Sequence, residues 1–397
     1  MLEIPDVSHP DCFKDGFPHP LFKKLREESP VHWVEKDWEG GPGYWIISRY
    51  QTIKSISRQP GLFGSAAGTS VEDRGDGFVS MISMDPPDHR RFRALVAGGF
   101  TPRLIQEQEP HHRDIVNKIL DEVTSRGECD FVVDIAAELP LRVIAELLGV
   151  PQSACRDIFQ WSNRMIGNQD DEYAVSLEEA GGAAMEMYGF ANRLAEERLA
   201  EPQDDLMSAI LHGEVDGQRL NLLEFDAFFL LLAVAGNETT RNLISQGMLL
   251  LLDRPDVMQR LRDDRSLLKG AIEEMLRFKS PVIYMRRTAL EDTVLEGQEI
   301  KRGQKLLMYY PSANRDADVF ERPDEFIVDR KDNNHLAFGV GEHFCIGTHL
   351  AKLETRVLFD GLLDRLHDVE IAGPVAYLRS NLIDGVKHLP IKFTGTG

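Results

Sequence analysis

The sequence predicts a mainly helical protein with a smaller β-rich part. Apolar residues recur at helical spacing through most of the chain after Pro86, and the longest such segment runs from Asn221 to Asp253. Short runs rich in aromatic and β-branched residues indicate strands. We expect helices in the ranges 103–125, 140–148, 177–199 and 348–360, and strands in the ranges 31–34, 44–47, 287–295, 305–310 and 386–393.

The composition is that of a large, acidic chain. There are 45 Lys and Arg against 65 Asp and Glu, a net charge of -20 that disfavours binding to nucleic acid. The four cysteines lack the spacing of a metal site, which fits a reducing compartment. The N-terminus has no apolar signal segment, and no apolar run reaches about 18 residues. We therefore expect a cytoplasmic protein with no membrane span and no nucleic-acid partner.

The long segment from Asn221 to Asp253 carries a helix start and an unusual centre. Asn221 and Glu224 have the spacing of a capping box. In the centre, Ala235 and Thr239 share one face of the helix. Gly236 beside them costs about 1 kcal/mol of helix stability relative to alanine. The centre is either a solvent-facing kink or a polar spot with a function.

Cys345 stands in a glycine-rich stretch followed by a predicted helix. Gly339, Gly341 and Gly347 allow sharp turns and the close approach of a flat ligand. A sulfur at a helix N-terminus faces the positive end of the helix dipole, which lowers the thiol pKa and favours thiolate. The alternative is a buried structural cysteine in a turn.

The spacing of this stretch, Phe338-x-x-Gly341-x-His343-x-Cys345-x-Gly347, resembles the haem-thiolate loop of the cytochrome P450 monooxygenases. The resemblance implies that Cys345 is the axial ligand of the iron of haem b, with Phe338 packed beside the sulfur. An electron-donating thiolate in that position favours O–O cleavage. The resemblance also implies the cytochrome P450 fold, with haem between the long central helix and the Cys345 loop and its helix. Because the family's motifs converge on one haem, residues 1–397 are expected to form a single domain.

The same resemblance gives roles to the centre of the long helix. Ala235 and Gly236 would leave room for dioxygen and contact the cofactor. Glu238 and Thr239 would be the catalytic pair that delivers protons. Many relatives have aspartate at the position of Glu238, so the longer side chain leaves the geometry of the relay open.

Haem propionates need cations, and the resemblance supplies candidates. The run from Asp85 to Arg93 places His89 and Arg93 on one face of a helix, although a solvated basic face is the alternative reading. His343 and Arg286 match two further propionate-binding positions, with the adjacent Arg287 as the alternative to Arg286.

A second motif, Glu274-x-x-Arg277, is weak by itself, because exposed pairs of this kind contribute about 0–1 kcal/mol. In the family this pair is buried and bound to a second arginine, for which Arg330 is the candidate. The expected role of Arg330 in this cluster is structural, namely to hold the Cys345 loop.

The resemblance implies a monooxygenase that uses O2 and two electrons from NAD(P)H, delivered by a ferredoxin and its reductase. We expect a monomer whose substrate is a hydrophobic small molecule: a terpenoid, a steroid or a branched lipid. The substrate-binding residues are expected to be Phe78, Met81, Ile82, Leu231, Leu232, Val282, Ile283, Tyr284, Leu382 and Ile383. The ferredoxin is expected to dock on a basic patch of Arg90, Arg91, Arg103 and Lys352.

Two other functions stay open at this point. A peroxygenase uses peroxide and needs no redox partner, but such enzymes usually lack the acid and hydroxyl of Glu238 and Thr239. A haem-thiolate sensor or binding module needs no proton relay and usually carries an output domain.

Overall fold

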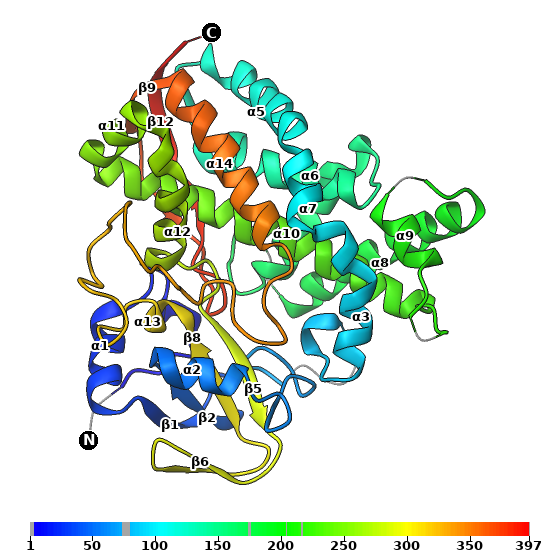
Figure 1. The fold of residues 1–397 in the computed structure, drawn as a ribbon, viewed down its shortest axis with the longest axis vertical. Helices are drawn as coiled ribbons and strands as arrows, with labels where there is room; N and C mark the ends of the chain where they lie inside the picture. The colour runs from blue at the N-terminus through cyan, green and yellow to red at the C-terminus, as the bar shows by residue number, and fades with distance from the viewer. Residues whose placement is uncertain (1–3, 74–79, 174–175, 204, 216, 397) are drawn as a thin grey trace.

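The computed structural model describes residues 4–73, 80–173, 176–203, 205–215 and 217–396. The helices gather in one part of the molecule and most strands in another (Figure 1). The N-terminus lies beside the strand-rich part, and the C-terminus lies at the opposite end. The predicted division into a helical part and a smaller β-rich part is confirmed.

The main sheet joins two distant parts of the chain. Its strand order is β1-β2-β8-β5-β3, and β2 pairs with β8 in parallel while the other neighbours are antiparallel. Both faces are buried: Trp45 and Leu306 pack on one face, and Tyr44 and Leu307 on the other. Helices therefore cover both faces of this sheet. The strands are β1 (Val31–Lys36), β2 (Pro42–Ile47), β3 (Phe63–Gly64), β4 (Glu128–Asp130), β5 (Tyr284–Ala289), β6 (Thr293–Leu295), β7 (Gln298–Ile300), β8 (Lys305–Tyr309), β9 (Leu366–Ile371), β10 (Ala376–Tyr377), β11 (Val386–His388) and β12 (Pro390–Gly395).

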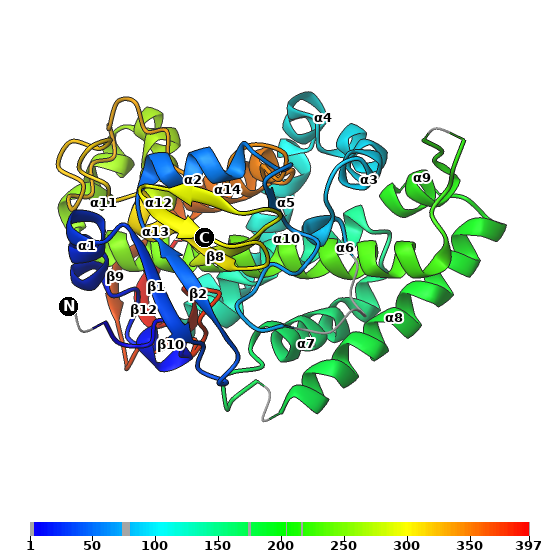
Figure 2. The same cartoon turned by 90° about the horizontal axis from the view of Figure 1, so that it is seen from below.

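The long helix predicted in the middle of the chain is α10 (Leu222–Asp253). The Asn221 side chain accepts from the amide of Glu224 at 3.0 Å, and the Glu224 carboxylate accepts from the amide of Asn221 at 2.9 Å. This reciprocal pair confirms the capping box. Figure 2 shows α10 crossing the molecule, with α7 and α8 below it and α12 and α14 above it. Its centre is consequently enclosed by other helices.

The other α-helices are α1 (His19–Glu28), α2 (Tyr50–Ser57), α3 (Asp88–Ala97), α4 (Pro102–Glu107), α5 (Glu109–Thr124), α6 (Glu138–Leu147), α7 (Cys155–Ile166), α8 (Leu177–Ala200), α9 (Leu206–His212), α11 (Pro255–Asp263), α12 (Leu268–Phe278), α13 (Tyr310–Ala313) and α14 (Thr348–Arg365). Among them, α6, α7, α8, α9, α11, α12 and α14 pack against α10.

Three predicted elements differ from the observed ones. The strand expected over residues 386–393 is divided into β11 and β12, which belong to different sheets. The single helix expected over residues 103–125 is divided into α4 and α5, because Pro110 in the first turn of α5 cannot continue a preceding helix. The strand expected over residues 287–295 starts earlier, at Tyr284, and ends at Ala289, so its last residues belong to the separate strand β6.

The carboxyl of Asp226 is buried where α8 packs against α10. Asp226 is 4% exposed, and its Oδ2 accepts from Asn192 Nδ2 at 2.7 Å. Its Oδ1 has no hydrogen-bond partner among the described residues. Burial raises the pKa of Asp226 to about 6. Because the folded protein binds this proton more tightly than the unfolded chain, the ionised carboxylate destabilises the fold increasingly as the pH rises towards 6.

We therefore expect Asp226→Asn to stabilise the protein by about 1–2 kcal/mol above pH 6, with the gain shrinking towards pH 4. The midpoint of thermal unfolding across this pH range measures the effect, and Asp171→Asn, at an exposed position, is the control. An equal gain at all pH values would contradict the assignment of the effect to a buried charge.

Candidate active site

The loop before α14 presents Cys345 by means of close backbone contacts. The amide of Cys345 donates to the carbonyl of Phe338 at 2.9 Å. Gly339 and Gly341 adopt φ values of +70 and +83, which favour glycine. A Cβ on Gly341 would lie 2.3 Å from the carbonyl oxygen of Ser57. The predicted sharp turns at these two glycines are confirmed.

The side chain of Cys345 faces a cavity between this loop and the middle of α10. The cysteine is exposed to that cavity. Burial among protein atoms raises the pKa of the Cys345 thiol, and the amide of Gly347 and the hydroxyl of Thr348 oppose this rise only in part. The predicted lowering of the pKa is therefore wrong for the polypeptide alone, because desolvation outweighs the helix terminus.

The cavity is largely apolar. The centre of α10 contributes Ala235, Gly236, Thr239 and Thr240, and the loop contributes Phe338, Cys345, Ile346 and Gly347. Other apolar lining residues are Met81, Ile82, Phe100, Ile144, Leu231, Leu232, Leu243, Leu276, Pro281, Val282, Met285, Ala337, Leu350 and Ala351.

The two small residues of α10 have different surroundings. A Cβ on Gly236 would lie 2.9 Å from Ile144 Cδ1, so the glycine allows close packing of α10 against α6. Ala235 is exposed to the cavity. The Thr239 hydroxyl donates to the carbonyl of Ala235 at 2.8 Å. Ala235 and Thr239 thus both lie on the part of α10 that borders the cavity.

Glu238 does not line the cavity. Its side chain is 1% exposed and forms an ion pair with Arg241, one turn further along α10. Successive helix residues are rotated by about 100°, and the rotation from Thr239 back to Glu238 leads away from the cavity, whereas the rotation on to Thr240 stays beside it. Thr239 and Glu238 are neighbours in the chain, but Thr239 faces the cavity and Glu238 points away from it.

Basic side chains border one part of the cavity. His89, Arg93, Arg287 and His343 all line it, and the rings of His89 and His343 lie 4.1 Å apart between centroids. Arg93 Nη2 also donates to the carbonyl of Phe344 at 2.7 Å, which ties α3 to the Cys345 loop. Burial and the nearby Arg287 lower the pKa of His343 to about 3, so its imidazole is neutral.

Comparison with known proteins agrees with this geometry. The family model named Cytochrome P450 matches residues 141–370. A steroid C26-monooxygenase of Rhodococcus jostii is 38% identical over 98% of this chain and 84% of its own length. A linalool 8-monooxygenase of Pseudomonas putida is 36% identical over 98% of this chain and 99% of its own length. The chain belongs to the cytochrome P450 family.

Solved structures of cytochromes P450 share the fold. One from Mycobacterium marinum, in complex with pseudoionone, has a TM-score of 0.91 and 35% sequence identity over 94% of each chain. One from Bacillus megaterium, in complex with testosterone, has a TM-score of 0.85 and 34% identity over 94% of this chain and 97% of that chain. Within the described residues, none of the helices has the length and apolar character needed to cross a membrane.

As a P450 monooxygenase, the protein belongs to a family whose members bind haem b. The residues around the cavity fit this cofactor. One thiol faces the cavity, apolar side chains cover most of its wall, and cationic and imidazole groups gather in one part of it. His89 Nδ1 is buried and has no hydrogen-bond partner among the described residues, and the carboxylate of Glu342 lies 4.0 Å from it, so the ring can still donate to an acceptor of a bound ligand.

The arginine of β5 that borders this cavity is Arg287, and the choice of Arg286 is wrong. Side chains alternate across a strand, so adjacent residues point to opposite faces. Arg286 points away from the cavity and pairs with Asp73 at 2.6 Å, whereas Arg287 lines the cavity. Met285, two residues before Arg287, lines it too and was missed. Because side chains alternate along β5, assigning Arg287 to the cavity would also have assigned Met285 to it.

Replacing the two arginines should distinguish their roles. We expect Arg287→Ala to release haem about 10- to 100-fold faster, because a shielded charge-assisted contact contributes about 1.5–3 kcal/mol. Arg286→Gln, which breaks the contact with Asp73 instead, should change the release rate less than threefold. The rate of haem transfer to apomyoglobin measures both. Faster loss from the Arg286 variant than from the Arg287 variant would contradict this assignment.

The predicted substrate residues divide into two groups. Met81, Ile82, Leu231, Leu232 and Val282 line the cavity. Four others do not, and Phe78 lies outside the described residues. These four pack behind the wall: Ile283 and Tyr284 are buried in the adjoining core, Leu382 packs against that core, and Ile383 forms a β-bridge with Val282. Burial behind a first layer of side chains is not visible in the sequence.

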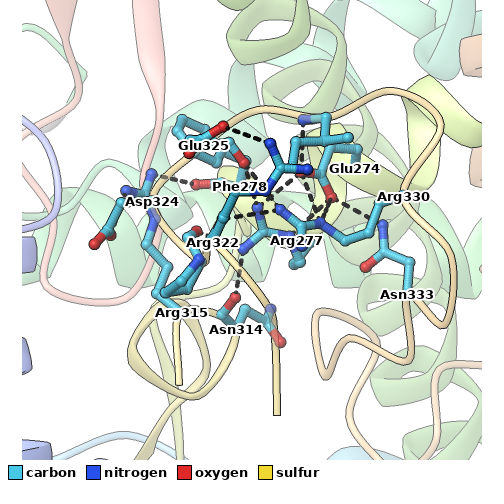
Figure 3. Close-up of polar contacts among 12 residues, drawn as sticks. Glu274, Arg277, Phe278, Asn314, Arg315, Arg322, Asp324, Glu325, Arg330 and Asn333 are labelled. Carbon is cyan, nitrogen blue, oxygen red and sulfur yellow. Dashed lines mark hydrogen bonds and ion pairs between the residues drawn. The ribbon is translucent and has the colours of Figure 1, made fainter. Parts of the chain in front are cut away.

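The Glu274 motif is a buried cluster (Figure 3). Glu274 and Arg277 are both 0% exposed, and their carboxylate and guanidinium groups form two hydrogen bonds of 2.8 Å. Arg330 Nε donates to the same carboxylate at 3.0 and 3.1 Å. Asn333 Nδ2 donates to it at 3.0 Å. The predicted triad of Glu274, Arg277 and Arg330 is confirmed, and Asn333 is an additional member.

Proposed function

We propose that this cytochrome P450 hydroxylates a terpenoid, a steroid or a branched lipid, and that its electrons come from a ferredoxin chain. The observation that carries the substrate class is the wall facing Cys345, where Leu231, Leu232 and Val282 stand with no charged neighbour from α10. Relatives with related hydrophobic substrates in their names, a steroid C26-monooxygenase and a linalool 8-monooxygenase, support it.

We assign the cofactor contacts as follows. Haem, when bound, supplies an iron centre that activates dioxygen and inserts one oxygen atom into a C–H bond of the substrate. Cys345 would bind its iron through the thiolate sulfur, and Phe338 and Gly347 would lie beside it. His89, Arg93, Arg287 and His343 would hold its two propionates. Ala235 and Gly236, which line the same cavity, would border the bound haem.

The remaining residues would act on substrate and protons. The apolar wall excludes water and holds the substrate by shape and burial. The Thr239 hydroxyl, which now donates to the carbonyl of Ala235, can hold a proton or a water at the cavity face. Glu238 is the candidate that brings protons to this position from the protein interior.

A screen of ligand-induced absorbance shifts tests the substrate class. We expect testosterone or linalool to shift the Soret band of the haem-loaded protein at micromolar to millimolar concentration, and Leu232→Phe to weaken that response by narrowing the wall. Lauric acid, a linear chain, serves as the comparison. A response to lauric acid with none to either branched or cyclic probe would overturn the substrate proposal.

For the electron donor we propose a ferredoxin that meets the protein on the face of the Cys345 loop. Each cation of the predicted docking patch has a carboxylate partner, namely Glu342 for Arg90, Glu224 for Arg91, Glu107 for Arg103 and Glu273 for Lys352. The face is therefore mixed in charge, and we expect only a weak dependence of reduction rate on salt. We further propose that residues 1–397 form one domain and that the protein is a monomer.

A further inference from the structure

Glu238 belongs to a chain of polar contacts that connects α10 with α7. Its carboxylate pairs with Arg241, whose side chain is 3% exposed. Arg241 Nη1 donates to Asn163 Oδ1 on α7 at 2.7 Å. The guanidinium of Arg241 also lies over the ring of Phe159, 5.8 Å from its centroid. The position of α7 therefore affects how firmly Arg241 is held.

Several polar atoms around this chain are buried and lack hydrogen-bond partners among the described residues. They are Glu238 Oε1, Arg241 Nε, Ser162 Oγ, and both Asn237 Oδ1 and Asn237 Nδ2. Asn237 and Arg241 are four residues apart on α10, and Ser162 precedes Asn163 on α7, so these atoms belong to the two helix segments that the contact of Arg241 with Asn163 joins. Buried polar atoms are normally satisfied by protein or by ordered water. A small group of ordered waters between α7 and α10 would satisfy all of them.

We propose that Arg241 and Asn163 are positioning residues for proton delivery, which hold the Glu238 carboxyl against ordered water between α7 and α10. This inference rests on the proposed function, because it concerns the acid assigned there. Thr239 borders the cavity and Glu238 does not, so the carboxyl must leave Arg241 and turn before it can pass a proton to the cavity face. Asn163 on α7 accepts a hydrogen bond from Arg241, so a shift of α7 would change how readily the Glu238 carboxyl leaves Arg241.

The surroundings of Glu238 agree with a group that can exchange protons. Burial raises its pKa, and Arg241 opposes the rise. Among the described residues, Arg241 is the cation that acts on Glu238, and the phenol of Tyr173, just after α7, is the other titratable group near the pair. Burial raises the pKa of Tyr173 to about 12, so this phenol stays neutral near pH 7.

Infrared spectroscopy of the haem-loaded protein tests this without turnover. The carbonyl stretch of protonated Glu238 is identified by its loss in Glu238→Gln made in each background. We expect the midpoint of the titration of this band to lie at least one pH unit higher in Arg241→Gln than in wild type. In Asn163→Ala the midpoint should lie between these two values. Arg241→Lys, which keeps the cation, should stay close to wild type. Asn192→Ala is the matched control, because Asn192 holds Asp226 of the same helix at 2.7 Å outside this cluster.

Turnover gives the second readout. We expect the share of electrons recovered in hydroxylated product to fall at least threefold in Asn163→Ala and to stay unchanged in Asn192→Ala. The proposal is overturned if Asn163→Ala and Arg241→Gln both keep the wild-type titration of Glu238. It is also overturned if a crystal structure shows no water bound to Glu238 Oε1 and Arg241 Nε. Failure of wild type to hydroxylate any substrate would instead refute the proposed function, and the infrared titration would still decide the present inference.

Discussion

Glu274→Gln should abolish stable haem retention. The Glu274 carboxylate is completely buried and accepts from Arg277, Arg330, Asn333 and the amide of Ile327 at 2.8–3.1 Å. Removing its charge leaves the fully buried Arg277 and the largely buried Arg330 without their carboxylate counter-ion. Breaking a buried pair in this way costs about 3–5 kcal/mol. Because Arg330 lies in the segment that leads to the Cys345 loop, that loop should lose its support.

The adjacent Glu273 provides a matched control. It pairs with His335 at 3.1 Å and with Lys352 at 2.8 Å, so it also reaches the loop segment and α14, but its side chain is 26% exposed. We expect Glu273→Gln to cost no more than about 1 kcal/mol. The measurements are the yield of haem-loaded protein and its midpoint of thermal unfolding. Equal effects of the two substitutions would show that burial of the Glu274 cluster does not determine how much it contributes to haem retention and to stability.

Thr239→Ala should keep haem and substrate binding but separate electron consumption from product formation. The Thr239 hydroxyl stands at the cavity face of α10, where Glu238 does not reach. A well-placed proton donor contributes about 10²–10⁴-fold in rate. We therefore expect at least a tenfold fall in product formed per electron consumed, with the difference appearing as hydrogen peroxide.

Thr239→Ser is the control for this prediction, because it keeps the hydroxyl and removes only a methyl group. Parallel assays of NADH consumed, hydroxylated product and peroxide give the coupling for each variant. Coupling equal to wild type in Thr239→Ala would mean that protons reach the cavity through other groups, such as Thr240, which also borders it.

Short motifs in the sequence predicted local structure well. The capping box of Asn221 and Glu224, the turns at Gly339 and Gly341, and the pair of Glu274 and Arg277 appear as expected, because each depends on few residues at fixed spacing. The distant Arg330 was found only through the family resemblance. The division of residues 103–125 into two helices could have been predicted from Pro110.

Side-chain direction was the main source of error. The choice between Arg286 and Arg287 depends on the phase of β5, which is set by pairing with β8 and cannot be read from an arginine pair. Helix geometry rotates Glu238 by about 100° from Thr239, but only the packing around α10 shows that this rotation leads away from the cavity, since Thr240 on the other side of Thr239 still borders it. The pairing of Glu238 with Arg241 and Asn163 required knowledge of how α7 packs on α10. The thiol pKa of Cys345 depended on burial, which local sequence does not report.

The central claim is that Cys345 supplies the thiolate that binds haem iron, and one spectrum tests it most directly. Haem-loaded protein is reduced under carbon monoxide, and the position of the Soret band is recorded for wild type, for Cys345→Ser and for a variant in which Cys12, Cys129 and Cys155 are all serine. We predict the strongly red-shifted band of thiolate ligation in wild type and in the triple variant, and its loss in Cys345→Ser. A histidine-type band in folded wild-type protein, or a red-shifted band that survives in Cys345→Ser, would contradict the assignment.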